Sequence, residues 1–157
     1  MKFINALVTL SILFLMHGCG GPGQDASVPQ AQHAAASDVD IGDYIVHFSA
    51  QSTDHLSPEI ARAYGIVRSK NRAMLTVSVL KEGSTTGVLA DITVETVNLA
   101  GQLKNVTMRK IQEQDAIYYI GETAVANRET LIFNISITPE GATDTSQVRF
   151  TREFYTN

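Results

Sequence analysis

The sequence has a single cysteine and no tryptophan among its 157 residues. One cysteine excludes an internal disulfide, so a folded domain must be held together by buried apolar surface alone. Cations are also scarce, because 12 Lys and Arg stand against 16 Asp and Glu and give a formal net charge of −4. A chain of this balance lacks the positive field that a phosphate backbone requires, and we do not expect nucleic acid as a partner.

Recognisable catalytic and metal-binding motifs are missing as well. The sequence contains no nucleophile elbow, no Walker loop and no His-Glu-x-x-His stretch, so no catalytic residue is assigned. His47 and His55 lie eight positions apart with only Asp54 beside them, whereas zinc needs three or four ligands. We expect two surface histidines, no metal and no cofactor.

Only the N-terminus carries a long apolar run. Met1 and Lys2 precede the apolar residues 3–16, and Gly18 and Cys19 follow. This order resembles a lipoprotein signal peptide over residues 1–18, cut before a cysteine that receives acyl chains. A small or branched residue is more usual at the position of His17 in the cleavage box. This departure concerns how efficiently the signal peptide is cleaved, not its assignment. The alternative is a plain signal peptide, but its cut site at residues 34–36 lies too far from the apolar run.

The mature chain is therefore expected to face the periplasm and to be held on a membrane by acyl chains on Cys19. Gly20 in place of an aspartate resembles lipoproteins sorted to the outer membrane. Residues 19–37 are rich in Gly, Pro, Ala, Gln and Ser without periodicity, which is typical of a flexible tether.

Residues 38–157 alternate between apolar and polar side chains with period two, which predicts half-buried strands. The apolar stripes occur in seven segments, which are residues 44–50, 75–79, 90–95, 103–111, 116–125, 131–137 and 148–154. Seven strands at this spacing indicate an all-β, immunoglobulin-like antiparallel sandwich. Tyr118 and Tyr119 must point to opposite faces of their strand, so we expect one in the core and the other exposed.

One segment interrupts the strand pattern. Ser57 can cap a helix, Pro58 suits its first turn, Glu59 favours its positive end and Gly65 can end it. These signals predict one short helix between the first two of the seven strands.

The residues from this helix onward resemble a known family. Four segments carry the likeness, namely Ala61-Arg62-Ala63-Tyr64-Gly65-Ile66-Val67-Arg68-Ser69-Lys70-Asn71-Arg72, Asn98-Leu99-Ala100-Gly101-Gln102, Asp115-Ala116-Ile117-Tyr118-Tyr119-Ile120 and Glu129-Thr130-Leu131-Ile132-Phe133. They are similar to exported gammaproteobacterial proteins catalogued only as a domain of unknown function, over residues 42–154. The resemblance implies a β-sandwich in the periplasm and no activity. Many relatives have a cleavable secretory leader, so a lipid anchor is a local variation.

Residues 62–72 form the strongest candidate site. They contain Arg62, Arg68, Lys70 and Arg72, with Tyr64 and Asn71 among them. Arginine offers bidentate geometry to carboxylates and phosphates, so this segment is predicted to bind an unidentified envelope protein of acidic character, an anionic glycan or a lipid headgroup. The competing interpretation is that these cations only brace the loop by pairing with Glu59, Glu95 or Glu122.

Two further functions stay open at this stage. The domain could be a structural or assembly subunit that pairs through an edge strand of its sandwich. It could also be an enzyme, although Asp115 near the two tyrosines is the main group that would suggest one. We favour a non-catalytic binding or accessory module.

The lipid anchor is directly testable. Because two or three acyl chains hold a protein on a bilayer almost permanently, replacing Cys19 with Ser should move the protein from the membrane fraction to the soluble periplasmic fraction. The measurement is immunoblotting of fractionated cells. An unchanged membrane pool would contradict the lipoprotein assignment.

Overall fold

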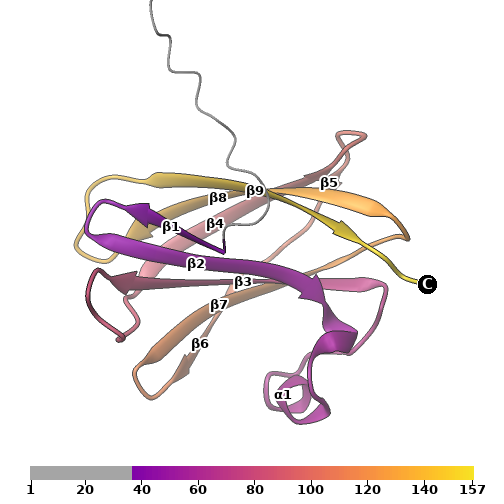
Figure 1. Ribbon diagram of the computed structural model, residues 1–157, viewed down its shortest axis with the longest axis horizontal. Coiled ribbons are helices and arrows are strands. Elements are labelled where there is room, and N and C mark those ends of the chain that lie inside the picture. Colours follow the sequence, from indigo (N-terminus) through magenta and orange to yellow (C-terminus); the bar gives the residue numbers. More distant parts are fainter. Residues whose placement is uncertain (1–36) are drawn as a thin grey trace, which may run out of the picture. The chain divides into compact units, whose positions relative to one another are not determined.

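The computed structural model describes residues 37–157 as a sandwich of two antiparallel sheets (Figure 1). The predicted signal peptide, Cys19 and residues 20–36 lie outside the described residues. The first sheet has the order β1 (Asp38–Ile41), β2 (Tyr44–Ser52), β3 (Arg72–Lys81), β7 (Ala116–Ala124) and β6 (Arg109–Glu113). The second sheet has the order β5 (Leu103–Lys104), β4 (Ala90–Asn98), β8 (Glu129–Pro139) and β9 (Ser146–Phe154).

The order of the strands is that of an immunoglobulin-like domain. Two neighbouring pairs, β3 with β7 and β4 with β8, are far apart in the chain, and both pairs are antiparallel. The chain thus changes sheet between β3 and β4, between β5 and β6, and again between β7 and β8. This is the Greek-key arrangement of immunoglobulin-like sandwiches, and the predicted fold class is confirmed.

Nine strands form where seven were expected. A short β1 precedes the first predicted strand, so the helix lies between β2 and β3, that is, after the second strand. The predicted single strand over 103–111 is instead two strands in different sheets. The crossing segment packs over Gly121, where a Cβ atom would lie only 2.6 Å from side-chain atoms of Val106 and Met108. A missing side chain on β7 therefore makes room for the change of sheet.

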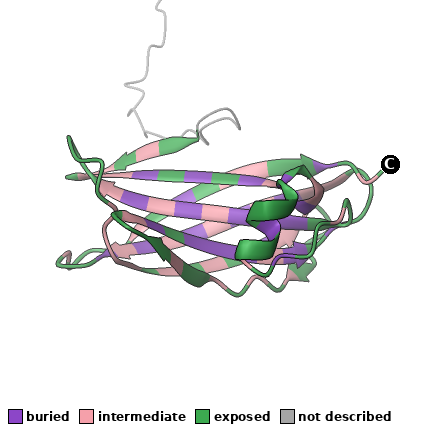
Figure 2. Ribbon diagram, turned by 90° about the horizontal axis from the view of Figure 1, so that it is seen from below, coloured by how far each residue is buried: buried purple, intermediate pink, exposed green. Residues whose placement is uncertain are grey.

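The core lies between the two inner faces, as the alternation predicted. Fully buried side chains come from both sheets and include Val46, Leu75, Val77, Val79, Leu131, Phe133, Ile135 and Ile137. Phe150 connects the layers, because its ring centroid lies 4.8 Å from that of Phe133 and 4.8 Å from that of Phe48. Figure 2 shows the resulting alternation of buried and exposed positions along the strands.

The two adjacent tyrosines divide as expected. Tyr119 is buried, and its hydroxyl accepts a hydrogen bond of 2.8 Å from the main-chain N–H of Ala90, which links β7 to β4 in the other sheet. Tyr118 points the other way and is 37% exposed on the outer face of the first sheet.

Helix α1 (Pro58–Ala63) forms as the capping signals predict. The Ser57 hydroxyl accepts a hydrogen bond of 3.2 Å from the N–H of Ile60, and Gly65 follows the helix with a φ of +64°. No helix of the described part, residues 37–157, is long and apolar enough to cross a membrane.

The connection from β2 to β3 covers apolar side chains on the outside of the first sheet. It begins with a 3-10 turn, η1 (Thr53–His55), followed by α1. Its apolar residues Leu56, Ala61 and Ile66 pack with Met74 of β3 and Ile120 of β7, both of which point away from the main core. The connection thus builds a second, smaller core on the outer face of the sheet.

Thr53 fixes the path of this connection. Its side chain is fully buried, and its hydroxyl lies 2.9 Å from the carbonyl oxygen of Val67 and 3.1 Å from that of Ser69. The same oxygen accepts a hydrogen bond of 2.9 Å from the N–H of Ser69. One hydroxyl therefore holds the return of the loop against its start, 16 residues earlier.

Replacing Thr53 with Val should lower the free energy of unfolding by about 1–3 kcal/mol, because the isosteric side chain leaves buried backbone groups without partners. Thr93→Val is the matched control, since Thr93 is exposed on β4, and it should change stability by less than about 0.5 kcal/mol. Urea denaturation of both variants measures the difference. Equal stabilities would show that Thr53 does not hold the connection.

Candidate functional site

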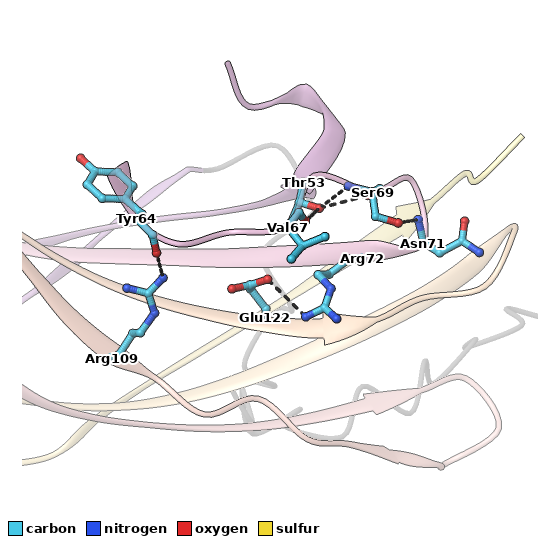
Figure 3. Close-up of polar contacts among 8 residues, drawn as sticks. All are labelled: Thr53, Tyr64, Val67, Ser69, Asn71, Arg72, Arg109 and Glu122. Atoms are coloured by element: carbon cyan, nitrogen blue, oxygen red, sulfur yellow. Dashed lines mark hydrogen bonds and ion pairs between the residues drawn. The ribbon is translucent and has the colours of Figure 1, made fainter. Parts of the chain in front are cut away.

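The predicted site, residues 62–72, runs from the last turn of α1 to the first residue of β3. Figure 3 shows this segment folded across the outer face of the first sheet. Its side chains do not converge on one point. They divide into a bracing group, an arginine pair beside an apolar hollow, and Tyr64, which faces a separate cleft.

The bracing group consists of Lys70, Asn71 and Arg72. The Lys70 ammonium group donates to the main-chain oxygen of Asn157 at 2.6 Å, and the carbonyl oxygen of Asn71 accepts a hydrogen bond of 3.0 Å from the N–H of Val125. Arg72 already belongs to β3, and its guanidinium forms an ion pair of 3.4 Å with Glu122 on β7. These three residues connect the end of the loop to neighbouring elements, but only Arg72 pairs with an acid that the bracing interpretation named, whereas Lys70 and Asn71 bond to main-chain groups.

The arginine pair is Arg62 and Arg68. Both line an open apolar hollow together with Ala61, Ile66 and Val67, the last of which is 65% exposed. Arg68 donates to the neutral carbonyl oxygen of Asp54 at 2.7 Å. Within residues 37–157, no carboxylate lies within 4.0 Å of its guanidinium.

Arg62 has only a weak internal partner. Its guanidinium lies 4.0 Å from the carboxylate of Glu59, and the two side chains are 79% and 76% exposed. Exposed pairs of this kind contribute about 0–1 kcal/mol. The charges of Arg62 and Arg68 are therefore available to an external anion.

Tyr64 faces the opposite side of α1 from this hollow, toward β6 and β7. It lines a cleft with Ile111, Glu113 and Tyr118. A hydrogen bond to the Glu113 carboxylate, partial burial and the negative charge of that carboxylate raise the pKa of the Tyr64 hydroxyl. The phenol therefore keeps its proton to a higher pH than an ordinary tyrosine does.

Arg109 attaches this end of α1 to the sheet. Its guanidinium donates to the main-chain carbonyl oxygen of Tyr64 (Figure 3). No local pattern marks Arg109, Ile111 and Glu113 as site residues, because they lie about 45 positions from α1 in the chain. Tyr118 differs from these residues, because the alternation of side chains along its strand already predicted that either Tyr118 or Tyr119 would be exposed.

The two described histidines lie apart from this site. His47 is on β2 and His55 in η1, and both are exposed. Across residues 37–157, no three side chains of His, Cys, Asp or Glu are grouped so that they could hold a metal ion.

Charge is distributed unevenly between the two ends of the sandwich. The turns β1–β2, β3–β4, β6–β7 and β8–β9 lie at the end away from α1 (Figure 1). They contain five acids and no Lys or Arg, the acids being Asp43, Glu82, Asp115, Glu140 and Asp144. The loops at the α1 end carry the cations Arg62, Arg68, Lys70 and Arg128 against the acids Asp54 and Glu59, so an approaching anion is drawn toward that end.

The edge strands have features that oppose pairing with another sheet. β1 has four residues, two of them aspartates, and β5 has two residues. β6 carries Arg109, Lys110 and Glu113. On β9, Arg152 alternates in register with Phe150 and Phe154 and places a charge on the core-facing side of the strand.

Comparison with known proteins gives a family but no activity. The model of a domain of unknown function, DUF4426, matches residues 38–157. The crystal structure of a DUF4426 family protein from Pseudomonas aeruginosa PAO1 is similar with a TM-score of 0.67 and 28% identity, covering 76% of this chain and 94% of that chain. No curated protein matches the chain.

Two more distant structures share the fold. One is a copper-bound variant of FetP from uropathogenic Escherichia coli strain F11, with 13% identity, a TM-score of 0.55, and coverage of 80% of this chain and 98% of that one. The other is FetP as isolated after expression in the periplasm, with 12% identity, a TM-score of 0.53, and coverage of 75% and 92%. At these identities the likeness shows the fold alone.

The family model covers the whole sandwich from β1 to β9, and the resemblance predicted from the sequence is confirmed: the chain belongs to the DUF4426 family, a family defined so far as a domain of unknown function.

Proposed function

We propose that this domain is a non-catalytic binding module of the bacterial cell envelope that docks an acidic partner protein at the α1 end of its sandwich. The observation that carries the proposal is the pair Arg62 and Arg68 beside an apolar hollow, with Arg68 bonded only to a neutral carbonyl group. Arginines around an exposed apolar centre are the composition typical of protein–protein interfaces.

The combination of charge and apolar surface favours a protein over a glycan or a lipid headgroup. Val67 is 65% exposed and lies between the arginines in sequence, flanked by the buried Ile66. A protein surface can cover Val67 while its carboxylates reach the two guanidinium groups. The acidic turns at the far end of the sandwich would orient such a partner before contact.

We further propose that the module faces the periplasm and is held to the outer membrane through Cys19. The leader and the cysteine behind Gly18 support this placement, and a distant neighbour, FetP, was produced in the periplasm. A tether of about 18 residues reaches at most roughly 60 Å, which would let the module meet partners away from the bilayer surface.

The edge-pairing alternative receives less support. Each edge of the two sheets within residues 37–157 is short, charged, or has a charged residue on its core-facing side. Natural sheets use these devices to prevent pairing with other chains.

Photo-crosslinking in cells tests the docking proposal. A photoreactive amino acid at Ser69, which directly follows Arg68, should give one dominant adduct whose mass spectrum identifies an acidic protein. The double substitution Arg62→Glu and Arg68→Glu should reduce this adduct at least about tenfold, because like charges then face each other across the interface.

Arg149→Glu is the matched control, because Arg149 is exposed on β9 in the other sheet, and it should leave the adduct intact. If the adduct contains a glycan or a lipid, the arginine pair would still be a binding site, but its partner would not be a protein. Absence of any adduct from correctly exported protein, or an adduct that survives the double substitution, would refute docking at this loop.

A further inference from the structure

A second hollow lies on the other side of α1, between the helix and the outer face of the first sheet. It has a volume of about 210 Å³. Met74 and Ile120 form its buried floor, and Ile111, Tyr64, Tyr118 and Glu113 form its walls. Pockets for drug-sized ligands are larger, roughly 300–1,000 Å³, so this cleft is suited to one small chemical group.

The charge within the cleft is negative. Glu113 is the one carboxylate among the lining residues, and none of them is Lys, Arg or His. Arg109 is on the same strand, but its guanidinium is bonded to the main-chain carbonyl of Tyr64, and the ring of Tyr64 points away from it (Figure 3). The cleft therefore combines two tyrosine rings, an apolar floor and a single carboxylate.

We propose that this cleft binds a small organic cation, specifically a quaternary ammonium group, held against the rings of Tyr64 and Tyr118 and beside the carboxylate of Glu113. Aromatic faces attract cations through their quadrupoles, and aromatic cages are a common means of recognising methylated ammonium groups. The methyl groups of such a cation also suit the apolar floor formed by Met74 and Ile120.

The shortage of hydrogen-bond acceptors selects a quaternary ammonium over a primary one. A primary ammonium group has three N–H donors to satisfy. The carboxylate of Glu113 is the one charged acceptor in the lining, and the other polar atoms of the lining side chains are hydroxyl groups of Thr76 and the tyrosines. A quaternary ammonium carries charge without any donor, so it leaves nothing unsatisfied. This inference is independent of docking at Arg62 and Arg68.

The four methionines of the chain provide reporters for a direct test. Met74 lies in the floor of the cleft, whereas Met108 packs against Gly121 away from it, and Met1 and Met16 lie in the predicted signal peptide. The full chain, labelled with ¹³C at the methionine methyl groups and purified in dodecyl maltoside, is titrated with choline and followed by NMR. The Met74 methyl signal should shift and saturate at millimolar choline, while the Met108 signal stays in place.

Three comparisons make the result specific. The neutral isostere 3,3-dimethylbutan-1-ol should bind at least about fivefold more weakly than choline, because it lacks the charge that the rings and Glu113 attract. Methylammonium should also bind at least about fivefold more weakly. Glu113→Gln should weaken choline binding by a similar factor, whereas Glu95→Gln, an exposed position on β4, should not change it.

An unchanged Met108 signal in Glu113→Gln would show that this variant is folded. The proposal is overturned if choline does not shift the Met74 signal, if the neutral isostere binds as tightly as choline, or if Glu113→Gln has no effect. Equal binding of methylammonium and choline would overturn the assignment to a quaternary ammonium.

Discussion

The arrangement of the candidate sites depends on the buried hydroxyl of Thr53. Three main-chain groups of the returning loop, the carbonyl oxygens of Val67 and Ser69 and the N–H of Ser69, converge on this single oxygen atom. Besides these bonds, the return of the connection is joined to its start by the hydrogen bond from Arg68 to the carbonyl oxygen of Asp54 and by apolar contacts. Because apolar contacts are not directional, they keep the connection compact, and the hydrogen bonds fix its path.

This connection also solves a problem of the sheet beneath it. An immunoglobulin-like sheet normally presents polar residues to water on its outer face, but β3 and β7 place Met74 and Ile120 there. The connection buries both side chains under Leu56, Ala61 and Ile66. It does not cover the sheet completely, and the uncovered strip between α1 and β6 is the cleft lined by Tyr64, Tyr118 and Glu113.

Helix α1 therefore separates two hollows of opposite character. One side carries the arginine pair Arg62 and Arg68 with the exposed Val67, and the other carries Glu113 with two tyrosines. The bracing contacts of Lys70, Asn71 and Arg72 hold the loop between them and connect it to β7 and to the C-terminal residues. A cluster of cations that looks uniform in the sequence thus has two roles, which only the partners of each side chain distinguish.

The sequence by itself determined which side chains enter the core and where the helix lies. Alternation with period two follows from the geometry of a strand, and the signals at Ser57, Pro58 and Gly65 are local, so both features were predictable. The split of residues 103–113 between two sheets was not, because it depends on the absence of a side chain at Gly121 on another strand. Nor could the cleft be predicted, since Glu113 and Arg109 meet Tyr64 only through the pairing of β6 with β7 and of β7 with β3. Local geometry is encoded in neighbouring residues, whereas the sites arise from contacts between segments that are distant in the chain, and only the tertiary structure brings those together.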